Sequence, residues 1–161
     1  VELLLNGTSL GKKAAGKEVG FRTLFETIFE PGTLTAVSYE NGQEIGRSEL
    51  ATAGEERTLV VEQEAYAGLK DAEQELVYVQ VEMRDQKGVL AADDNQKITL
   101  SVDGDVEVLG FGSGNPKPNY NFNEGVTELF GGRAQIIVKK PEGKVTLTVT
   151  AENGVEGKVT L

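Results

Sequence analysis

The chain contains no cysteine and no histidine. Without thiolate or imidazole groups it cannot form a disulfide, a Cys/His zinc site, a Ser-His-Asp triad or a cysteine nucleophile. Tryptophan is absent too, and because Trp offers the largest aromatic face to a sugar, its absence weighs against a dedicated glycan-binding module. No run of residues approaches the roughly 20 apolar positions that a membrane-spanning helix needs. The sequence therefore predicts no catalytic residues, no metal and no cofactor.

Positive charge is scarce relative to negative charge. The net charge is −10, of which −3 falls on residues 1–57 and −7 on residues 58–161. Such a charge repels phosphate backbones and anionic lipid head groups, so we expect neither nucleic acid nor a membrane surface as a partner. The acidic residues are spread along alternating segments, which is typical of solvated outer strand faces.

Residues 1–57 are predicted to form short strands joined by tight turns. Asn6-Gly7 and Asn41-Gly42 each separate two apolar segments, and this dipeptide favours the positive φ angles of two-residue hairpin turns. The even spacing of Phe21, Phe25 and Phe29 predicts a further strand that ends at Pro31-Gly32. A unit this small would bury too little surface to be robust alone, so we expect its first strands to lie upstream of Val1.

The polar segment 51–57 is the predicted boundary, and a second module is predicted over residues 58–161. Apolar residues alternate in short runs separated by turns every 8 to 12 residues, which is typical of an immunoglobulin-like sandwich. One segment stays ambiguous: Ala65, Leu69, Ala72 and Leu76 share a helical stripe, yet Gly68 interrupts it, so a helix within residues 62–76 is left open. The predicted fold class is all-β, with two tandem immunoglobulin-like sandwiches of which the first is incomplete at its N-terminus.

The longest irregular segment, Leu109 to Phe122, is the candidate functional loop. Aromatic rings beside amides suit a sugar or a protein interface, whereas rings that fold back would simply cover the end of the sandwich. The candidate ligand or interface residues are Phe111, Asn115, Asn119, Tyr120 and Phe122.

Two other patterns are weaker. The glycines at 110, 112 and 114 are spaced as in some nucleotide sites, but Pro116 and Pro118 exclude the helix that would have to follow. Asp93-Asp94-Asn95 and Asp103-Gly104-Asp105 contain calcium-type oxygens, but the same residues make ordinary turns.

Several longer strings occur in a fixed order along nearly the whole chain: VELLLNGTSLGKK, FEPGTLTAVSYENGQEIGRSELATAGE, LVYVQVEMRDQKGVLAADDNQKITLSVDG, LGFGSGNP and FGGRAQIIVKKPEGKVTLTVTAENG. Together they resemble the C-terminal accessory region of bacterial family 2 glycoside hydrolases of the β-galactosidase type. One local departure is Asn115-Pro116, where relatives usually carry Asp-Pro.

The resemblance implies a short β-sandwich module through residue 57 and a larger immunoglobulin-like or invasin-like module over 58–161, both following a catalytic barrel. It implies that the fragment itself is not an enzyme, because the two catalytic Glu residues belong to the barrel of a parent that hydrolyses O-glycosyl bonds. The expected role is to support that barrel or its assembly. The expected partners are the upstream barrel of the same chain, candidate carbohydrate ligands and, through the parent, a homo-oligomer. The alternative is a glycan-binding or cell-surface adhesive module, and an extracellular or periplasmic location is favoured over a cytoplasmic one.

Overall fold

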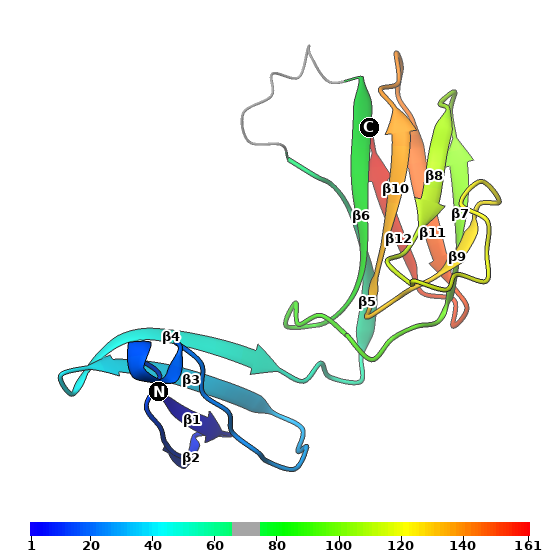
Figure 1. The fold of residues 1–161 in the computed structure, drawn as a ribbon. Coiled ribbons are helices and arrows are strands. Elements are labelled where there is room, and N and C mark those ends of the chain that lie inside the picture. The colour runs from blue at the N-terminus through cyan, green and yellow to red at the C-terminus, as the bar shows by residue number, and fades with distance from the viewer. Residues whose placement is uncertain (66–74) are drawn as a thin grey trace. The chain divides into compact units, whose positions relative to one another are not determined.

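The computed structural model describes residues 1–65 and 75–161, where all regular structure apart from the short 3-10 helix η1 (Lys17–Val19) is β-strand. The chain divides into two compact units, Val1–Thr52 and Ala53–Leu161. Figure 1 shows the strands of each unit. The prediction of an all-β chain is confirmed, while the immunoglobulin-like and invasin-like detail stays a prediction.

Unit 1 contains one antiparallel sheet with the spatial order β2-β1-β3-β4. Its strands are β1 (Glu2–Leu5), β2 (Thr8–Lys12), β3 (Thr33–Glu40) and β4 (Gln43–Ala51). The β1–β2 turn has φ angles of 51° at Asn6 and 80° at Gly7, and the β3–β4 turn has 50° at Asn41 and 82° at Gly42. Both Asn-Gly hairpins are therefore confirmed, because this dipeptide tolerates two successive positive φ angles.

The predicted strand through Phe21, Phe25 and Phe29 is wrong. Residues 22–30 have no regular structure, and Phe21 itself has a φ of 58°, which is incompatible with an extended strand. No described strand pairs with this segment, and a strand requires a partner for its backbone hydrogen bonds. The described residues of unit 1 form a single sheet, and its completion into a sandwich by further strands stays a prediction.

Unit 2 contains two four-stranded antiparallel sheets, ordered β5-β6-β10-β8 and β12-β11-β7-β9. Their strands are β5 (Arg57–Gln63), β6 (Leu76–Asp85), β7 (Lys97–Asp103), β8 (Val108–Gly112), β9 (Val126–Glu128), β10 (Arg133–Lys139), β11 (Thr146–Ala151) and β12 (Glu156–Thr160). The sequence predicts all of these except β9, which is only three residues long. It pairs with β7 and lies between the irregular segment and β10, where the sequence shows no alternating pattern.

The core of unit 2 lies between the two sheets. Val79 and Val81 of β6 and Leu147 and Val149 of β11 are completely buried in one cluster, because alternate residues of each strand point inward. In the described part of the chain every buried hydrophobic side chain except Val37 belongs to this cluster. Unit 2 therefore has a sandwich core of its own.

One glycine sets how closely the two sheets approach at an edge. A Cβ at Gly157 of β12 would collide with the backbone carbonyl oxygen of Leu59 in β5. Only a residue without a side chain lets these two strands come so near. The outer face of the β5-β6-β10-β8 sheet is left uncovered by the other sheet.

The open question of a helix within residues 62–76 falls mostly outside the described residues, since Leu69 and Ala72 lie in the gap. On either side of the gap, β5 ends at Gln63 and β6 begins at Leu76. The helix stays a prediction.

Candidate functional site

The candidate loop is partly strand and partly irregular. Its first residues belong to β8, where Phe111 is 1% exposed and packs in the core. Phe122 is half exposed, and its ring lies where a side chain on Gly112 would be. The backbone N–H of Phe111 donates to the carbonyl oxygen of Phe122 over 2.8 Å, so the end of the loop lies along β8.

The other three candidate residues lie further out on the loop. The half-buried Asn115 closes a turn, in which its Oδ1 accepts the backbone N–H of Lys117 over 2.9 Å. Asn119 is exposed and Tyr120 is half-buried. None of these three lines the groove described next, whereas Phe111 and Phe122 do.

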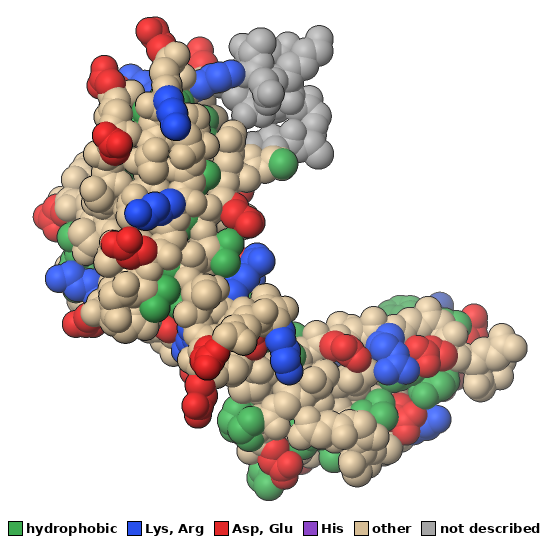
Figure 2. All heavy atoms as spheres, turned by 180° about the vertical axis from the view of Figure 1, so that it is seen from behind, with side chains coloured by type: hydrophobic (Ala, Val, Ile, Leu, Met, Phe, Trp, Pro, Cys, Tyr) green, Lys and Arg blue, Asp and Glu red, His purple; other side chains and the backbone are tan. Residues whose placement is uncertain are grey.

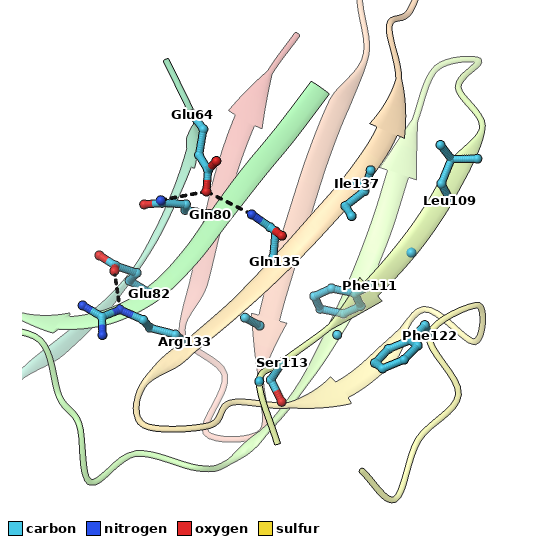
Figure 3. A pocket seen from close by; sticks show the side chains of 14 residues that line it. Glu64, Gln80, Glu82, Leu109, Phe111, Ser113, Phe122, Arg133, Gln135 and Ile137 are labelled. Atoms are coloured by element: carbon cyan, nitrogen blue, oxygen red, sulfur yellow. Dashed lines mark hydrogen bonds and ion pairs between the residues drawn. The ribbon is translucent and has the colours of Figure 1, made fainter. Parts of the chain in front are cut away.

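The groove has a volume of about 590 Å³ and lies on the outer face of the β5-β6-β10-β8 sheet (Figure 3). Its size falls within the range of about 300–1,000 Å³ that is usual for small-molecule sites. A bulge in the β8–β10 pairing, where Val138 pairs with Val108 and Ile137 with Gly110, adds Leu109 to its lining. The apolar part of the lining thus contains Leu109, Ile137 and Phe122, with Gly110 and Gly112 beside them in β8, and the Phe122 ring lies against Gly112.

Side-chain amides and one carboxylate line the other end. The Nε2 atoms of Gln80 in β6 and Gln135 in β10 donate to the same Oε1 of Glu64, over 2.8 and 3.0 Å. Figure 3 shows both amides turned toward this carboxylate. Because each amide carries two N–H groups and a carbonyl oxygen, this arrangement leaves hydrogen-bonding capacity directed at the groove.

A charged pair completes the lining. Glu82 is only 8% exposed, and its Oε1 accepts Nε–H of Arg133 over 2.8 Å while its Oε2 is bound by Arg84. Burial alone would raise the pKa of Glu82, but the hydrogen bonds from Arg133 and Arg84 outweigh burial and hold this pKa below its ordinary value. Glu82 is therefore a carboxylate locked in an ion pair.

The acidic segment Asp93-Asp94-Asn95 ties parts of unit 2 together. Arg57 donates from Nη2 to Asp93 over 2.8 Å and from Nη1 to Asp94 over 3.2 Å, and Asn95 Oδ1 accepts the backbone N–H of Gly131 over 2.9 Å. The hydrogen bond from Arg57 lowers the pKa of Asp93. The side-chain oxygens of this segment thus accept hydrogen bonds from within unit 2. Within residues 1–65 and 75–161, no three Asp or Glu residues are grouped as a metal site would require.

The sequence did not predict six residues of the groove: Glu64, just after β5, and the strand residues Gln80, Glu82, Arg133, Gln135 and Ile137. Each of the strand residues alternates with buried neighbours, as residues on any outer strand face do. The sequence contained one signal for this groove: Gly110 is a glycine on the outer face of a predicted strand, and Gln80 and Gln135 lie on the outer faces of two other predicted strands. Joining these positions requires the strand order, which the sequence does not reveal.

Unit 2 is thus an antiparallel β-sandwich module that carries a groove on one outer face. No helix in the described residues is long and apolar enough to cross a membrane. Residues 59–160 match the family described as glycoside hydrolase family 2 C-terminal domain 5, and the chain belongs to that family. Residues 1–46 match a family described only as a domain of unknown function (DUF4982). The predicted resemblance to the C-terminal region of a family 2 glycoside hydrolase is confirmed.

Longer proteins contain similar regions. The chain is 30% identical over 155 residues to the β-galactosidase BoGH2A of Bacteroides ovatus, covering 94% of this chain and 18% of that protein. It is 31% identical over 159 residues to a putative β-glucuronidase of Formosa agariphila, covering 94% of this chain and 15% of that protein. A crystal structure of a glycosyl hydrolase family 2 member from Bacteroides cellulosilyticus superposes with a TM-score of 0.87 at 26% identity, over 99% of this chain and 22% of that one. The chain therefore spans less than a fifth of the curated relatives.

Proposed function

We propose that the chain is the non-catalytic C-terminal accessory part of a β-galactosidase-like glycosidase, and that it stabilises the catalytic part of its parent by packing against it. The family match supports a place in a glycoside hydrolase. The names of the two curated relatives, a β-galactosidase and a putative β-glucuronidase, support a parent that hydrolyses O-glycosyl bonds. We take galactose as the sugar that the parent releases, because the β-galactosidase is the relative whose name is not marked as putative.

The observation that carries this proposal is the apolar surface of unit 1. Six large hydrophobic side chains are 65–80% exposed: Phe21, Leu24, Ile28, Phe29, Ile45 and Leu50. Apolar side chains are visible at the surface of unit 1 in Figure 2. Large exposed hydrophobic groups mark interaction surfaces, and burying each of them against a partner would contribute about 1.5–3 kcal/mol.

The state of two buried carboxylates, Glu82 and Asp94, supports a non-catalytic role. Glu82 is held by two arginines and Asp94 by Arg57, so each is already bound by a cation in the fold. A general acid needs a raised pKa, whereas the pKa of Glu82 is lowered.

The test compares the parent enzyme with its Phe21→Ser/Phe29→Ser variant. We expect the apparent Tm of the catalytic part to fall by several degrees, because the proposed contact between unit 1 and the catalytic part would lose two aromatic rings. Phe130→Ser is the matched control, since Phe130 is a half-exposed aromatic in unit 2, and it should leave the Tm unchanged. Light scattering on the same samples reports whether the parent is a homo-oligomer.

The chain alone is then incubated with an aryl β-galactoside, and we expect no turnover above the blank. Turnover by the chain would contradict the non-catalytic role. A parent Tm that does not respond to loss of both rings would contradict the packing role.

A further inference from the structure

The accessory role uses the surface of unit 1 and leaves the groove of unit 2 without a function. Among the described residues, the groove is a hollow of about 590 Å³ on the face of one sheet that points away from the other sheet, with chemically distinct ends. Concave sites with an apolar lining and a few converging polar groups are where proteins bind small molecules.

Gly110 is the first reason to expect an occupant. It lies within β8, its φ is not in the left-handed region, and a Cβ built on it would meet no atom within 4 Å. Gly110 adjoins the bulge at Leu109, but its φ is not left-handed, so neither the conformation of this bulge nor packing within the described residues requires glycine there. Glycine weakens a strand, so its presence is explained if another molecule approaches the backbone closely at this point.

The polar end is the second reason. Gln80 and Gln135 lie on neighbouring strands and are both oriented by the Glu64 carboxylate, at 2.8 and 3.0 Å. An amide held in this way donates and accepts hydrogen bonds in a fixed direction at little cost in side-chain entropy. Two such amides side by side suit a ligand that presents several hydroxyl groups.

The charges of the lining select against an ionic ligand. The guanidinium of Arg133 is engaged by Glu82, which also binds Arg84, and the chain carries a net charge of −10. An anion would therefore be repelled by the whole chain and would have to compete with Glu82 for Arg133. A cation would have to compete with two arginines at Glu82 and with the amides of Gln80 and Gln135 at Glu64.

A sugar ring matches both ends of the groove. Its C–H face can lie over Gly110 against Ile137 and the ring of Phe122, while its hydroxyl edge reaches Gln80 and Gln135. We propose that the groove over Gly110 is a binding site for a neutral oligosaccharide. This proposal goes beyond the accessory role and does not rest on it.

The whole chain is titrated, by calorimetry and by NMR of its backbone amides, with neutral oligosaccharides prepared from galactan, glucan, mannan and xylan. An oligogalacturonate serves as the acidic comparison. We expect at least one neutral series to bind and to shift the amide signals of Gly110 and Gln135, and we expect the acidic oligosaccharide not to bind.

Gly110→Val fills the groove from its floor. Binding should weaken at least about tenfold because the ring can no longer approach the backbone. The Tm should stay the same or rise, since valine suits a strand and has open space here. Gly46→Val is the matched control: Gly46 also lies within a strand, β4, with no atom within 4 Å of its Cβ and no left-handed φ. It should bind like the wild type.

If Gly110→Val lowers the Tm, Gln135→Leu replaces it, because this change removes an amide from the groove while keeping the side chain's bulk. It should also weaken binding at least about tenfold. Absence of binding by all four neutral series at millimolar concentration would overturn the proposal and assign the space over Gly110 to packing against another protein segment. Binding that survives both substitutions, or a preference for the acidic oligosaccharide, would overturn it too.

Discussion

At the scale of single residues, Asp85 at the end of β6 binds three backbone N–H groups from two stretches of the chain. Its Oδ2 accepts the N–H of Gly54 over 2.9 Å, and its Oδ1 accepts those of Lys87 and Val89 over 2.9 and 2.8 Å. The bonds to Lys87 and Val89 close the turn after β6, and the bond to Gly54 attaches the segment that precedes β5. A carboxylate with only acceptor sites is suited to collecting three N–H donors.

We expect Asp85→Asn to lower the Tm of unit 2 by roughly 5 °C or more at neutral pH. The substitution places an NH₂ group where one carboxylate oxygen now accepts a hydrogen bond, so at least one backbone N–H loses its partner. Circular dichroism during heating measures the change. Asp105→Asn, an exposed aspartate in another turn, is the control and should leave the Tm unaltered.

The stabilisation that Asp85 contributes should depend on pH. The N–H groups of Gly54 and Val89 hold the pKa of Asp85 below its ordinary value, so the folded chain binds fewer protons at this carboxyl than the unfolded chain. The stabilisation is therefore fully present above the unfolded pKa of about 3.9 and is lost as the pH falls through the lower folded pKa. The Tm difference between wild type and Asp85→Asn should be constant near neutrality and shrink in acid. A difference that widened on acidification would refute this assignment.

The turn at Asp85-Gln86-Lys87-Gly88 was predictable, because an aspartate that binds the backbone just after itself is a local signal. The bond to Gly54 was not, since 31 residues separate the partners. Gln80 and Gln135 show the same division: the sequence predicts that they face outward, and only the pairing of β6 with β10 brings both of them to Glu64.

At the scale of the elements, the approach of β12 to β5 depends on Gly157. We expect Gly157→Ala to destabilise unit 2 by about 1–3 kcal/mol, because the new methyl group would collide with the Leu59 carbonyl oxygen and force the strands apart. Urea unfolding followed by circular dichroism measures the change.

Gly143→Ala provides the comparison for Gly157→Ala. Its Cβ would meet no atom within 4 Å and its φ is not left-handed, so this variant should be as stable as the wild type or slightly more so. Equal stability of the two alanine variants would show that β12 and β5 do not need their present spacing.

Elements defined by local chemistry were the predictable ones. The two Asn-Gly hairpins and the Val-rich strand β6 can each be predicted from a window of about ten residues. The phenylalanines of 21–29 have the spacing of a strand, but a strand exists only where a neighbour supplies hydrogen bonds, and spacing cannot reveal that neighbour. The short strand β9 is formed by its pairing with β7 and has too few residues to show a pattern.

At the scale of the whole molecule, buried apolar area is divided very unevenly. Among the described residues of unit 1, Val37 alone is a buried hydrophobic side chain, whereas unit 2 has a continuous core between two sheets. Since burial of apolar surface is the main stabilising contribution, unit 1 should be the less stable unit when the chain stands alone.

We therefore expect two unfolding transitions, with unit 1 melting first. Leu147→Ala should destabilise unit 2 by about 2–5 kcal/mol through the cavity it leaves, and so lower the upper transition only. Calorimetry resolves the transitions, and hydrogen exchange by mass spectrometry assigns each to its residues. A single transition that moves as a whole in the Leu147→Ala variant would contradict this division.

In the described residues, another segment of the chain lies against each border of the groove-bearing sheet at one point. Gly157 of β12 lies against β5 at one border, and the carbonyl oxygen of Phe122 takes the N–H of Phe111 at the other. Among the described residues, a copy of the chain that approached this sheet from the side would meet β12 at Leu59 and the end of the loop at Phe111 before it reached these backbone groups. Each of these contacts obstructs strand-to-strand addition at the point where it lies.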